Sequence, residues 1–145
     1  MTTTFAEWRR LGDWPGVYEA LSDSLAHYAV VYRAKIAGYV FMPSHLHVVL
    51  FIDGKQLGPF MRDLKKFTAQ KSLPVLGINK SPVWMPRYDR VQIEAEEILR
   101  IKLDYIHQNP VRAGLVIRPE LWRWSSAADY LAGSPGPVPV WKDWA

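Results

Sequence analysis

The spacing of apolar residues changes several times along the chain and divides it into helices and strands. From about residue 16 to residue 30 the apolar positions recur at helical spacing, which predicts a helix there. These positions are Val17, Ala20, Leu21, Leu25 and Tyr28. Residues 30–42 and 45–52 are instead rich in Val, Ile, Tyr and Phe and are separated by Pro43 and Ser44. This pattern predicts two antiparallel strands joined by a tight turn.

Further elements are expected on both sides of this hairpin. Residues 2–5 are β-branched and then aromatic, which favours a short strand that pairs with the sheet. A second helical stripe, with basic residues elsewhere on the same helix, follows the hairpin. It comprises Leu57, Phe60, Met61, Leu64, Phe67 and Thr68. Residues 73–86 contain three prolines and are expected to form a loop, with a strand over residues 83–93. Acidic residues at 94, 96 and 97 predict the start of a helix of about residues 94–109, which Pro110 ends.

The order of these elements is strand, helix, strand, strand, helix, strand, helix. It predicts an α+β fold: a ferredoxin-like split βαβ antiparallel sheet with helices on one face and an added C-terminal helix. Residues 1–133 are expected to form this domain. Prolines and glycine at residues 135–137 predict an irregular C-terminal tail over residues 134–145.

Composition narrows the chemistry without deciding it. The 145 residues, 49% apolar and 22% charged, suit one folded domain with a real core. A net charge of +4 favours a polyanionic partner. The absence of cysteine excludes disulfides, zinc-thiolate sites and thiol catalysis, so any metal must be held by nitrogen and oxygen ligands. No basic segment followed by a long apolar run is seen, and we expect a soluble, cytoplasmic protein.

Two histidines stand at the start of the third predicted strand. Side chains alternate along a strand, so His45 and His47 are expected on one face and Leu46 on the other. Imidazoles at this spacing can hold a divalent metal. They are also consistent with two half-exposed histidines that pair with carboxylates or face water. The spacing alone leaves both interpretations open.

A second group of polar residues lies on the last predicted helix. Tyr105 and Asn109 are four residues apart and share one flank, beside the apolar stripe of this helix. That stripe comprises Leu99, Leu103 and Ile106. Tyr105 can also be a core tyrosine, and asparagine before Pro110 is a common helix end. His107 lies about 200° around the helix from Tyr105, so it is a poor candidate for the general base of that tyrosine.

Taken together, the two segments are more specific than either alone. The first reads Met42-Pro43-Ser44-His45-Leu46-His47-Val48-Val49-Leu50. The second reads Asp104-Tyr105-Ile106-His107-Gln108-Asn109-Pro110-Val111-Arg112-Ala113-Gly114-Leu115-Val116. In this combination the chain resembles the REP-associated tyrosine transposases of the HUH class. The resemblance extends from about residue 2 to residue 130 and includes Trp124-Ser125-Ser126-Ala127.

The resemblance implies a reaction and a role for each residue. His45 and His47 correspond to the HUH histidines that hold a divalent metal, Mg²⁺ or Mn²⁺, and Asn109 to the polar residue that completes the metal site. Tyr105 corresponds to the nucleophile and is expected to approach the histidines across the fold. The enzyme would cut single-stranded DNA at hairpin or palindromic repeats through a 5′-phosphotyrosine intermediate and rejoin strands. Single-stranded or hairpin DNA is the expected partner, and a homodimer is a second possible assembly.

Basic and aromatic residues offer contacts to such DNA. The basic candidates for phosphate contacts are Arg62, Lys65, Lys66, Lys71, Lys102, Arg112, Arg118 and Arg123. Solvated charge on a helix is the alternative for each of them. The candidates for stacking on unpaired bases are Trp122, Trp124, Trp141 and Trp144. For Trp122 and Trp124, packing of the tail against the core is an equally good interpretation.

Two other functions fit the same pattern. The first is a binding module of this fold that recognises DNA hairpins but does not cut them. The second is a metal-dependent phosphoesterase that uses water in place of Tyr105. Formation of a covalent adduct with DNA separates the tyrosine mechanism from both.

Overall fold

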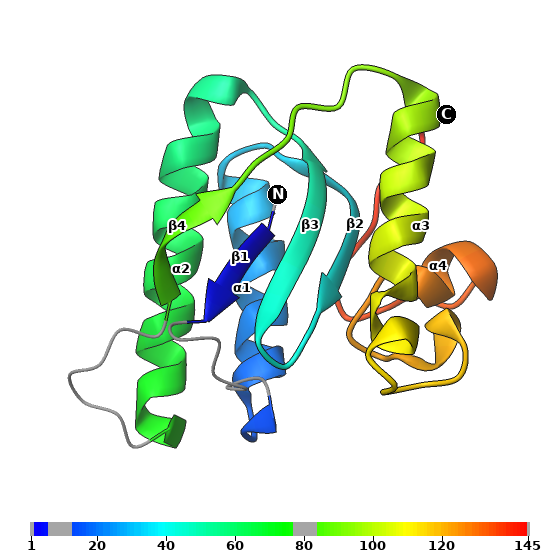
Figure 1. The fold of residues 1–145 in the computed structure, drawn as a ribbon. Helices are drawn as coiled ribbons and strands as arrows, with labels where there is room; N and C mark the ends of the chain where they lie inside the picture. Colours follow the sequence, from blue (N-terminus) through cyan, green and yellow to red (C-terminus); the bar gives the residue numbers. More distant parts are fainter. Residues whose placement is uncertain (1, 6–12, 77–83, 145) are drawn as a thin grey trace.

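The chain folds into an antiparallel sheet covered by helices on both faces, as seen in a computed structural model that describes residues 2–5, 13–76 and 84–144 (Figure 1). The elements are β1 (Thr2–Phe5), α1 (Val17–Val31), β2 (Lys35–Phe41), β3 (His45–Phe51), α2 (Gly54–Leu76), β4 (Trp84–Asp89), α3 (Glu96–Arg112), the 3₁₀ turn η3 (Pro119–Leu121) and α4 (Ala127–Leu131). The predicted α+β class is confirmed. None of the helices in the described part of the chain is long and apolar enough to cross a membrane.

The sheet places β3 in its interior. The strand order is β2-β3-β1-β4, and each neighbouring pair is antiparallel. Thr2 of β1 lies opposite His47 and Thr4 lies opposite His45, so the predicted pairing of the first segment with the sheet is confirmed. The hairpin predicted from residues 30–42 and 45–52 is also present, as β2 and β3, but its first strand begins only at Lys35 because α1 continues to Val31. Because β3 is paired on both sides, its backbone is fixed along the sheet.

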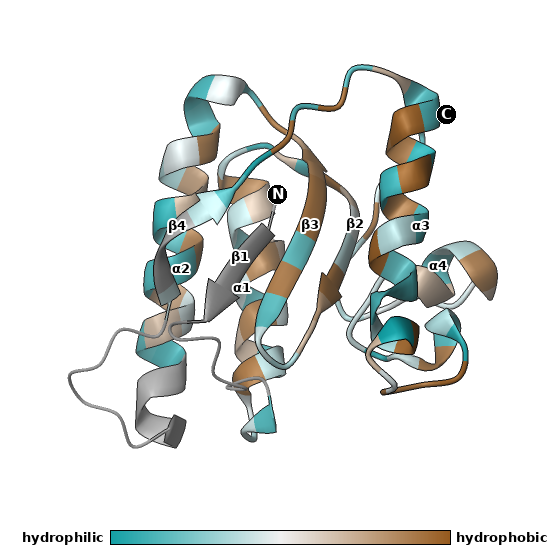
Figure 2. Cartoon of the chain, viewed as in Figure 1, coloured by the Kyte–Doolittle hydropathy of each residue, from teal (hydrophilic) through white to brown (hydrophobic). Residues whose placement is uncertain are grey.

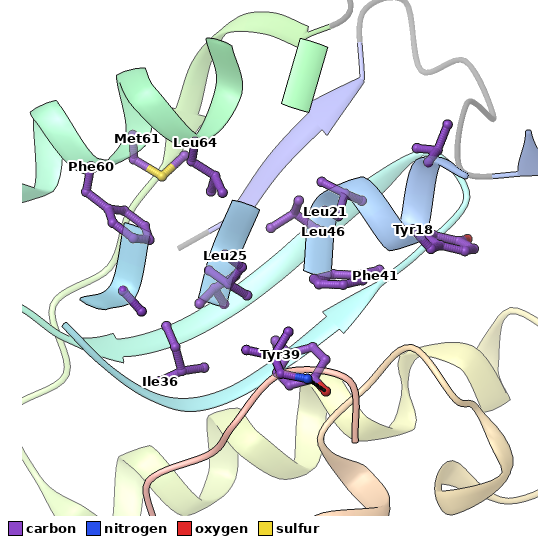
Figure 3. Close-up of a cluster of buried hydrophobic side chains, with 14 of the residues drawn as sticks. Tyr18, Leu21, Leu25, Ile36, Tyr39, Phe41, Leu46, Phe60, Met61 and Leu64 are labelled. Atoms are coloured by element: carbon purple, nitrogen blue, oxygen red, sulfur yellow. Dashed lines mark hydrogen bonds between the residues drawn. The ribbon is translucent and has the colours of Figure 1, made fainter. Parts of the chain in front are cut away.

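Alternate residues of β3 enter two different hydrophobic cores. Leu46 and Val48 pack with β2 against α1 and α2 (Figure 3). Val49 packs on the opposite face, where the second core lies between the sheet and α3. That core contains Ala37, Val40, Met42, Val49, Leu99, Leu103 and Ile106. Figure 2 shows β2 and β3 with many hydrophobic positions, whereas α3 alternates between hydrophobic and hydrophilic ones. Two helices therefore cover one face, and α3 covers the other.

Gly38 allows α3 to approach β2 closely. A Cβ atom at this position would overlap Leu103 Cδ2 and lie 3.1 Å from Ser126 Oγ. The pairing of β2 with β3 also shifts register between Ile36 and Gly38, which marks an irregularity at this point. A side chain at position 38 would therefore have to displace Leu103 in the core between α3 and the sheet.

The segment that follows α3 covers the outer edge of β2. Phe41 N–H donates to Trp124 O at 2.8 Å, and Ser126 N–H donates to Tyr39 O at 3.0 Å. Trp122 Nε1 donates to Phe41 O at 2.9 Å. Both tryptophans pack against the core of α1 and α2, so their packing interpretation is the one observed. The covered edge is closed to pairing with other strands.

Residues 134–144 contain no helix or strand, yet they are packed against the fold. Val138 is fully buried, and its N–H donates to Tyr39 Oη at 3.2 Å. Trp141 N–H donates to Ile36 O at 2.8 Å, and Trp144 Nε1 donates to Tyr130 Oη at 3.1 Å. The irregular tail expected from the sequence is thus an ordered covering of β2 and α3.

Several predicted boundaries are wrong, mainly because of prolines. The helix α2 continues to Leu76, into the expected loop of residues 73–86. The strand expected over 83–93 ends at Asp89, and residues 90–95 form a connection. The last helix does not end before Pro110: it runs to Arg112 with Pro110 buried inside it. Its last turn is closed by Ala113 N–H to Asn109 O at 3.0 Å and Leu115 N–H to Pro110 O at 2.9 Å. The short helix α4 was not predicted.

His107 joins α3 to the segment over the β2 edge. The imidazole is buried, and its Nε2 lies 2.7 Å from Ser126 Oγ. Ser126 Oγ also accepts the N–H of Tyr39 at 2.9 Å. Burial lowers the pKa of His107 to about 4, with a partly opposing effect of Asp104. This histidine is therefore a neutral structural residue, in agreement with its expected unsuitability as the base of Tyr105.

Substituting Gly38 by alanine is expected to destabilise the fold. The added methyl group would force the Leu103 side chain out of its packed position, which costs about 1–3 kcal/mol in a packed core. The matched control is Gly54→Ala at the start of α2, where a Cβ meets nothing within 4 Å. That change should leave stability unchanged or raise it by up to about 1 kcal/mol. Urea unfolding followed by circular dichroism measures both, and equal stability of the two variants would show that α3 does not approach β2 as described.

His107 is expected to make stability depend on acid pH. The unfolded chain takes up a proton near the ordinary pKa of 6.5, whereas the folded chain takes it up only near pH 4. Stability is therefore lost as the pH falls from 6.5 to 4, by roughly 3 kcal/mol in total. His107→Gln keeps a polar side chain beside Ser126 but cannot titrate. We expect the difference in unfolding free energy between the natural chain and this variant to shrink or reverse over that window, whereas parallel curves would contradict the assignment.

Candidate active site

His45 and His47 point to one face of the internal strand β3. Their ring centroids are 4.9 Å apart, and the planes meet at 89°. Leu46, between them, is buried in the core on the other face. The predicted arrangement of the pair on one face of a central antiparallel strand is confirmed. The two imidazoles therefore lie next to each other on a regular strand, and no loop is needed to bring these two possible metal ligands together.

Both histidines are neutral at pH 7. Burial lowers the pKa of His45. The pKa of His47 falls to about 4, mainly through burial and further because protonated His47 would be repelled by His45 in its protonated form and by Arg112. Ser44 Oγ lies 3.1 Å from His45 Nδ1, a contact that holds the orientation of this ring. Neutral imidazoles keep a lone pair available for a cation.

Tyr105 lies against this pair from α3. Its ring meets the ring of His47 edge-on, with centroids 6.3 Å apart and planes at 82°. Leu99, Leu103 and Ile106 anchor α3 on the sheet, which leaves Tyr105 at the flank of the helix beside β3. Its side chain is 55% exposed, so Tyr105 is not a core tyrosine. The expected approach of Tyr105 to the histidines across the fold is observed.

A cavity opens between β3, α3 and the connection after β4. Its volume is about 260 Å³, and His47, Lys102 and Tyr105 line it together with apolar residues. Val91 and Ile93 of the connection form part of its wall. A larger cavity of about 750 Å³ adjoins it, shares Val49 and those two residues, and extends to Trp144. Tyr105 and His47 therefore face a space that a ligand can enter.

Six of the eight basic residues expected to bind DNA form two sets, one beside Tyr105 and one on α2. Lys102 lines the Tyr105 cavity, and the guanidinium of Arg112 lies 4.4 Å from the centre of the Tyr105 ring. Arg62, Lys65, Lys66 and Lys71 lie on α2, which packs on the opposite face of the sheet. Of the two remaining arginines, Arg123 lies 4.6 Å from the Trp124 ring and Arg118 pairs with Glu120 at 3.4 Å. The α2 set is not brought together with Tyr105.

The possible metal ligands near Tyr105 suit a divalent metal ion that accepts both nitrogen and oxygen ligands. Within the described ranges, no three or more His, Cys, Asp or Glu residues are grouped so that they could hold a metal ion. Asn109, the third ligand expected from the sequence, lies one turn after Tyr105 on α3. Two neutral imidazoles with one amide oxygen suit Mn²⁺ better than Mg²⁺, which prefers oxygen alone.

Three features of the site were not predicted from the sequence. They are the contact of Ser44 with His45, the stacking of Arg112 on Tyr105, and the cavity wall formed by residues 91 and 93. Arg112 is seven residues after Tyr105, which is close to two helical turns and places both on one side of α3. That spacing could have indicated the contact, had the helix not been expected to end at residue 109.

Comparison with known proteins supports the fold, whereas the function has to be inferred from the geometry of the site. No protein-family model matches the chain, and no curated protein matches it. A solved structure of a REP-associated tyrosine transposase bound to a REP hairpin does match, with a TM-score of 0.75 and 21% sequence identity. The match covers 97% of this chain and 83% of that chain. The resemblance indicated by the two sequence motifs is therefore confirmed in the fold.

Proposed function

We propose that this chain is a tyrosine transposase of the REP-associated kind, which cuts and rejoins single-stranded DNA at a hairpin or palindromic repeat. The observation that carries the proposal is the edge-on contact of Tyr105 with His47, beside a cavity that both residues line. The similar solved structure, a REP-associated tyrosine transposase bound to a REP hairpin, supports it. We also assign the sheet to the ferredoxin-like split βαβ class, because α1 links β1 to β2 while β3 lies between them.

In the proposed reaction Tyr105 is the nucleophile. Its hydroxyl oxygen attacks the phosphorus of the scissile phosphodiester and loses its proton to solvent. A bond forms between Tyr105 Oη and the 5′-phosphate, and the bond to the 3′-oxygen of the preceding nucleotide breaks. That oxygen takes up a proton and leaves as a 3′-hydroxyl. The phosphotyrosine bond retains the energy of the cut bond, so a 3′-hydroxyl can reverse the step and join strands without ATP.

We propose that His45, His47 and Asn109 hold Mg²⁺ or Mn²⁺. When bound, such an ion would polarise the scissile phosphate and stabilise the charge that develops on its oxygens. The lowered pKa values of both histidines support the assignment, because neither imidazole has to lose a proton at pH 7 to act as a ligand. Ser44 would keep the His45 ring in place for this role.

The two sets of basic residues suggest two parts of a DNA contact. Lys102 lines the Tyr105 cavity, so we assign it to phosphates next to the cleaved bond. The α2 set and Arg123 are assigned to more distant phosphates of the hairpin. These residues contact only the backbone in this proposal, so they would contribute affinity and salt dependence and not sequence preference.

A second candidate function is a binding module that holds DNA hairpins without cutting them. The observation that favours it is the lack of a third His, Cys, Asp or Glu ligand near His45 and His47 in the described part of the chain. Both functions predict hairpin binding, and only the transposase predicts a covalent product.

Tyr105→Phe is expected to abolish the covalent adduct and keep DNA binding. The change removes one oxygen from a half-exposed ring, so hairpin affinity should change less than about twofold and the melting temperature should hardly move. The measurement uses a labelled single strand that carries a hairpin, with Mn²⁺, and denaturing gels for the adduct. Cleavage by this variant at the natural rate would show a water nucleophile and favour the phosphoesterase.

His45→Ala is expected to stop cleavage for a different reason, the loss of a metal ligand. Mn²⁺ affinity, measured by calorimetry on the protein alone, should fall at least about tenfold. Tyr105→Phe serves as the control here, because it should leave Mn²⁺ affinity unchanged. Unchanged affinity in His45→Ala would show that this histidine does not hold the metal, whatever its effect on cleavage.

A further inference from the structure

Arg112 contacts Tyr105 in two ways at once. Its guanidinium lies over the Tyr105 ring, 4.4 Å from the ring centre. Its Nη2 donates to the main-chain oxygen of Tyr105 at 2.6 Å. Seven residues turn a helix by about 700°, roughly 20° short of two turns, so the two residues share one side of α3. The arginine side chain runs back along the helix toward its N-terminus, which is the direction that side chains in a helix favour.

Arg112 is the last residue of α3, and the Tyr105 carbonyl that accepts from it lies in the interior of the same helix. The contact therefore ties the last turn of α3 to the turn that carries Tyr105.

Tyr105 depends on such contacts for a defined position. Its side chain is 55% exposed and lies at the flank of α3, outside the apolar stripe that anchors the helix. The rings of His47 and Tyr105 meet at 82°, and the guanidinium of Arg112 lies over the Tyr105 ring. An exposed tyrosine without a contact on its face can change rotamer on a fast timescale. Two contacts from different directions restrict the ring to one arrangement.

We propose that Arg112 is a positioning residue for the nucleophile: it clamps the Tyr105 ring against His47, so that the hydroxyl stays at the cavity both residues line. The inference rests on the proposed role of Tyr105. It departs from the sequence-based expectation that Arg112 contacts a DNA phosphate. A clamp acts on the rate of the chemical step, whereas a phosphate contact acts on affinity, and the two can be separated.

The first test compares chemistry with affinity in two Arg112 variants. Arg112→Met should slow adduct formation at saturating hairpin DNA by about 10- to 100-fold, the loss typical of a misplaced reacting group. Hairpin affinity, measured with Tyr105→Phe also present, should change less than about twofold. Arg112→Lys keeps the charge but not the planar stack, so it should stay nearly as slow as Arg112→Met.

The matched control is Arg100→Met. Arg100 lies on the same helix, and its guanidinium lies 5.1 Å from the Trp144 ring, away from Tyr105. We expect this variant to form the adduct at the natural rate. The clamp is overturned by full rescue in Arg112→Lys. It is also overturned if Arg112→Met weakens binding, lowers the salt dependence by about one ion and leaves the saturated rate unchanged.

A second measurement examines the ring without any DNA. With 3-fluorotyrosine placed at position 105, Arg112→Met should move the ¹⁹F resonance toward that of free fluorotyrosine and narrow the line, at a fixed pH of 7. Arg100→Met should leave it in place. An unmoved resonance in Arg112→Met overturns the clamp. A moved resonance in a protein that never forms an adduct supports the clamp and contradicts the proposed transposase, so the two failures are distinguishable.

Discussion

The strand β3 must serve two buried faces of the sheet at once, and the rest of the structure depends on this constraint. Leu46 and Val48 enter the core of α1 and α2, while His45 and His47 point to the side of α3. Neighbouring strands on both sides hold the backbone of β3, so the register that buries the leucine also fixes the imidazoles. A shift by one residue would exchange the two faces. Core packing and donor placement are therefore a single property of this strand.

The second half of the site depends on how closely α3 approaches the sheet. Gly38 leaves room for Leu103, and the core around these residues sets the position of Tyr105 along β3. The segment of residues 122–126 then covers the β2 edge, and His107 joins it to α3 through Ser126. The nucleophile candidate is thus an exposed side chain on a firmly anchored helix. Its remaining freedom is that of its own side chain, which His47 and Arg112 contact.

The spacing of apolar residues predicted the helices and strands well in segments where the pattern had only one interpretation. The two β-rich segments on either side of Pro43 and Ser44 predicted the hairpin, and the strand period of two predicted the shared face of His45 and His47. Proline was a poor indicator of helix ends in two places, since Pro74 and Pro110 both lie inside helices that were predicted to end before them. Burial in the last turn of α3 outweighs the local preference of Pro110. The tail was expected to be irregular, but its packing against β2 depends on contacts between residues far apart in sequence, such as Val138 with Tyr39.

The central claim is that Tyr105 itself becomes linked to DNA, and peptide mapping of the adduct tests it most directly. Trypsin cuts after Lys102 and Arg112, which gives a peptide of residues 103–112 with Tyr105 as its one tyrosine. After reaction with a hairpin-bearing single strand and Mn²⁺, followed by nuclease digestion, mass spectrometry should find this peptide carrying a nucleotide through its tyrosine. A nucleotide on any other residue, or cleaved DNA without a modified peptide, would contradict the account.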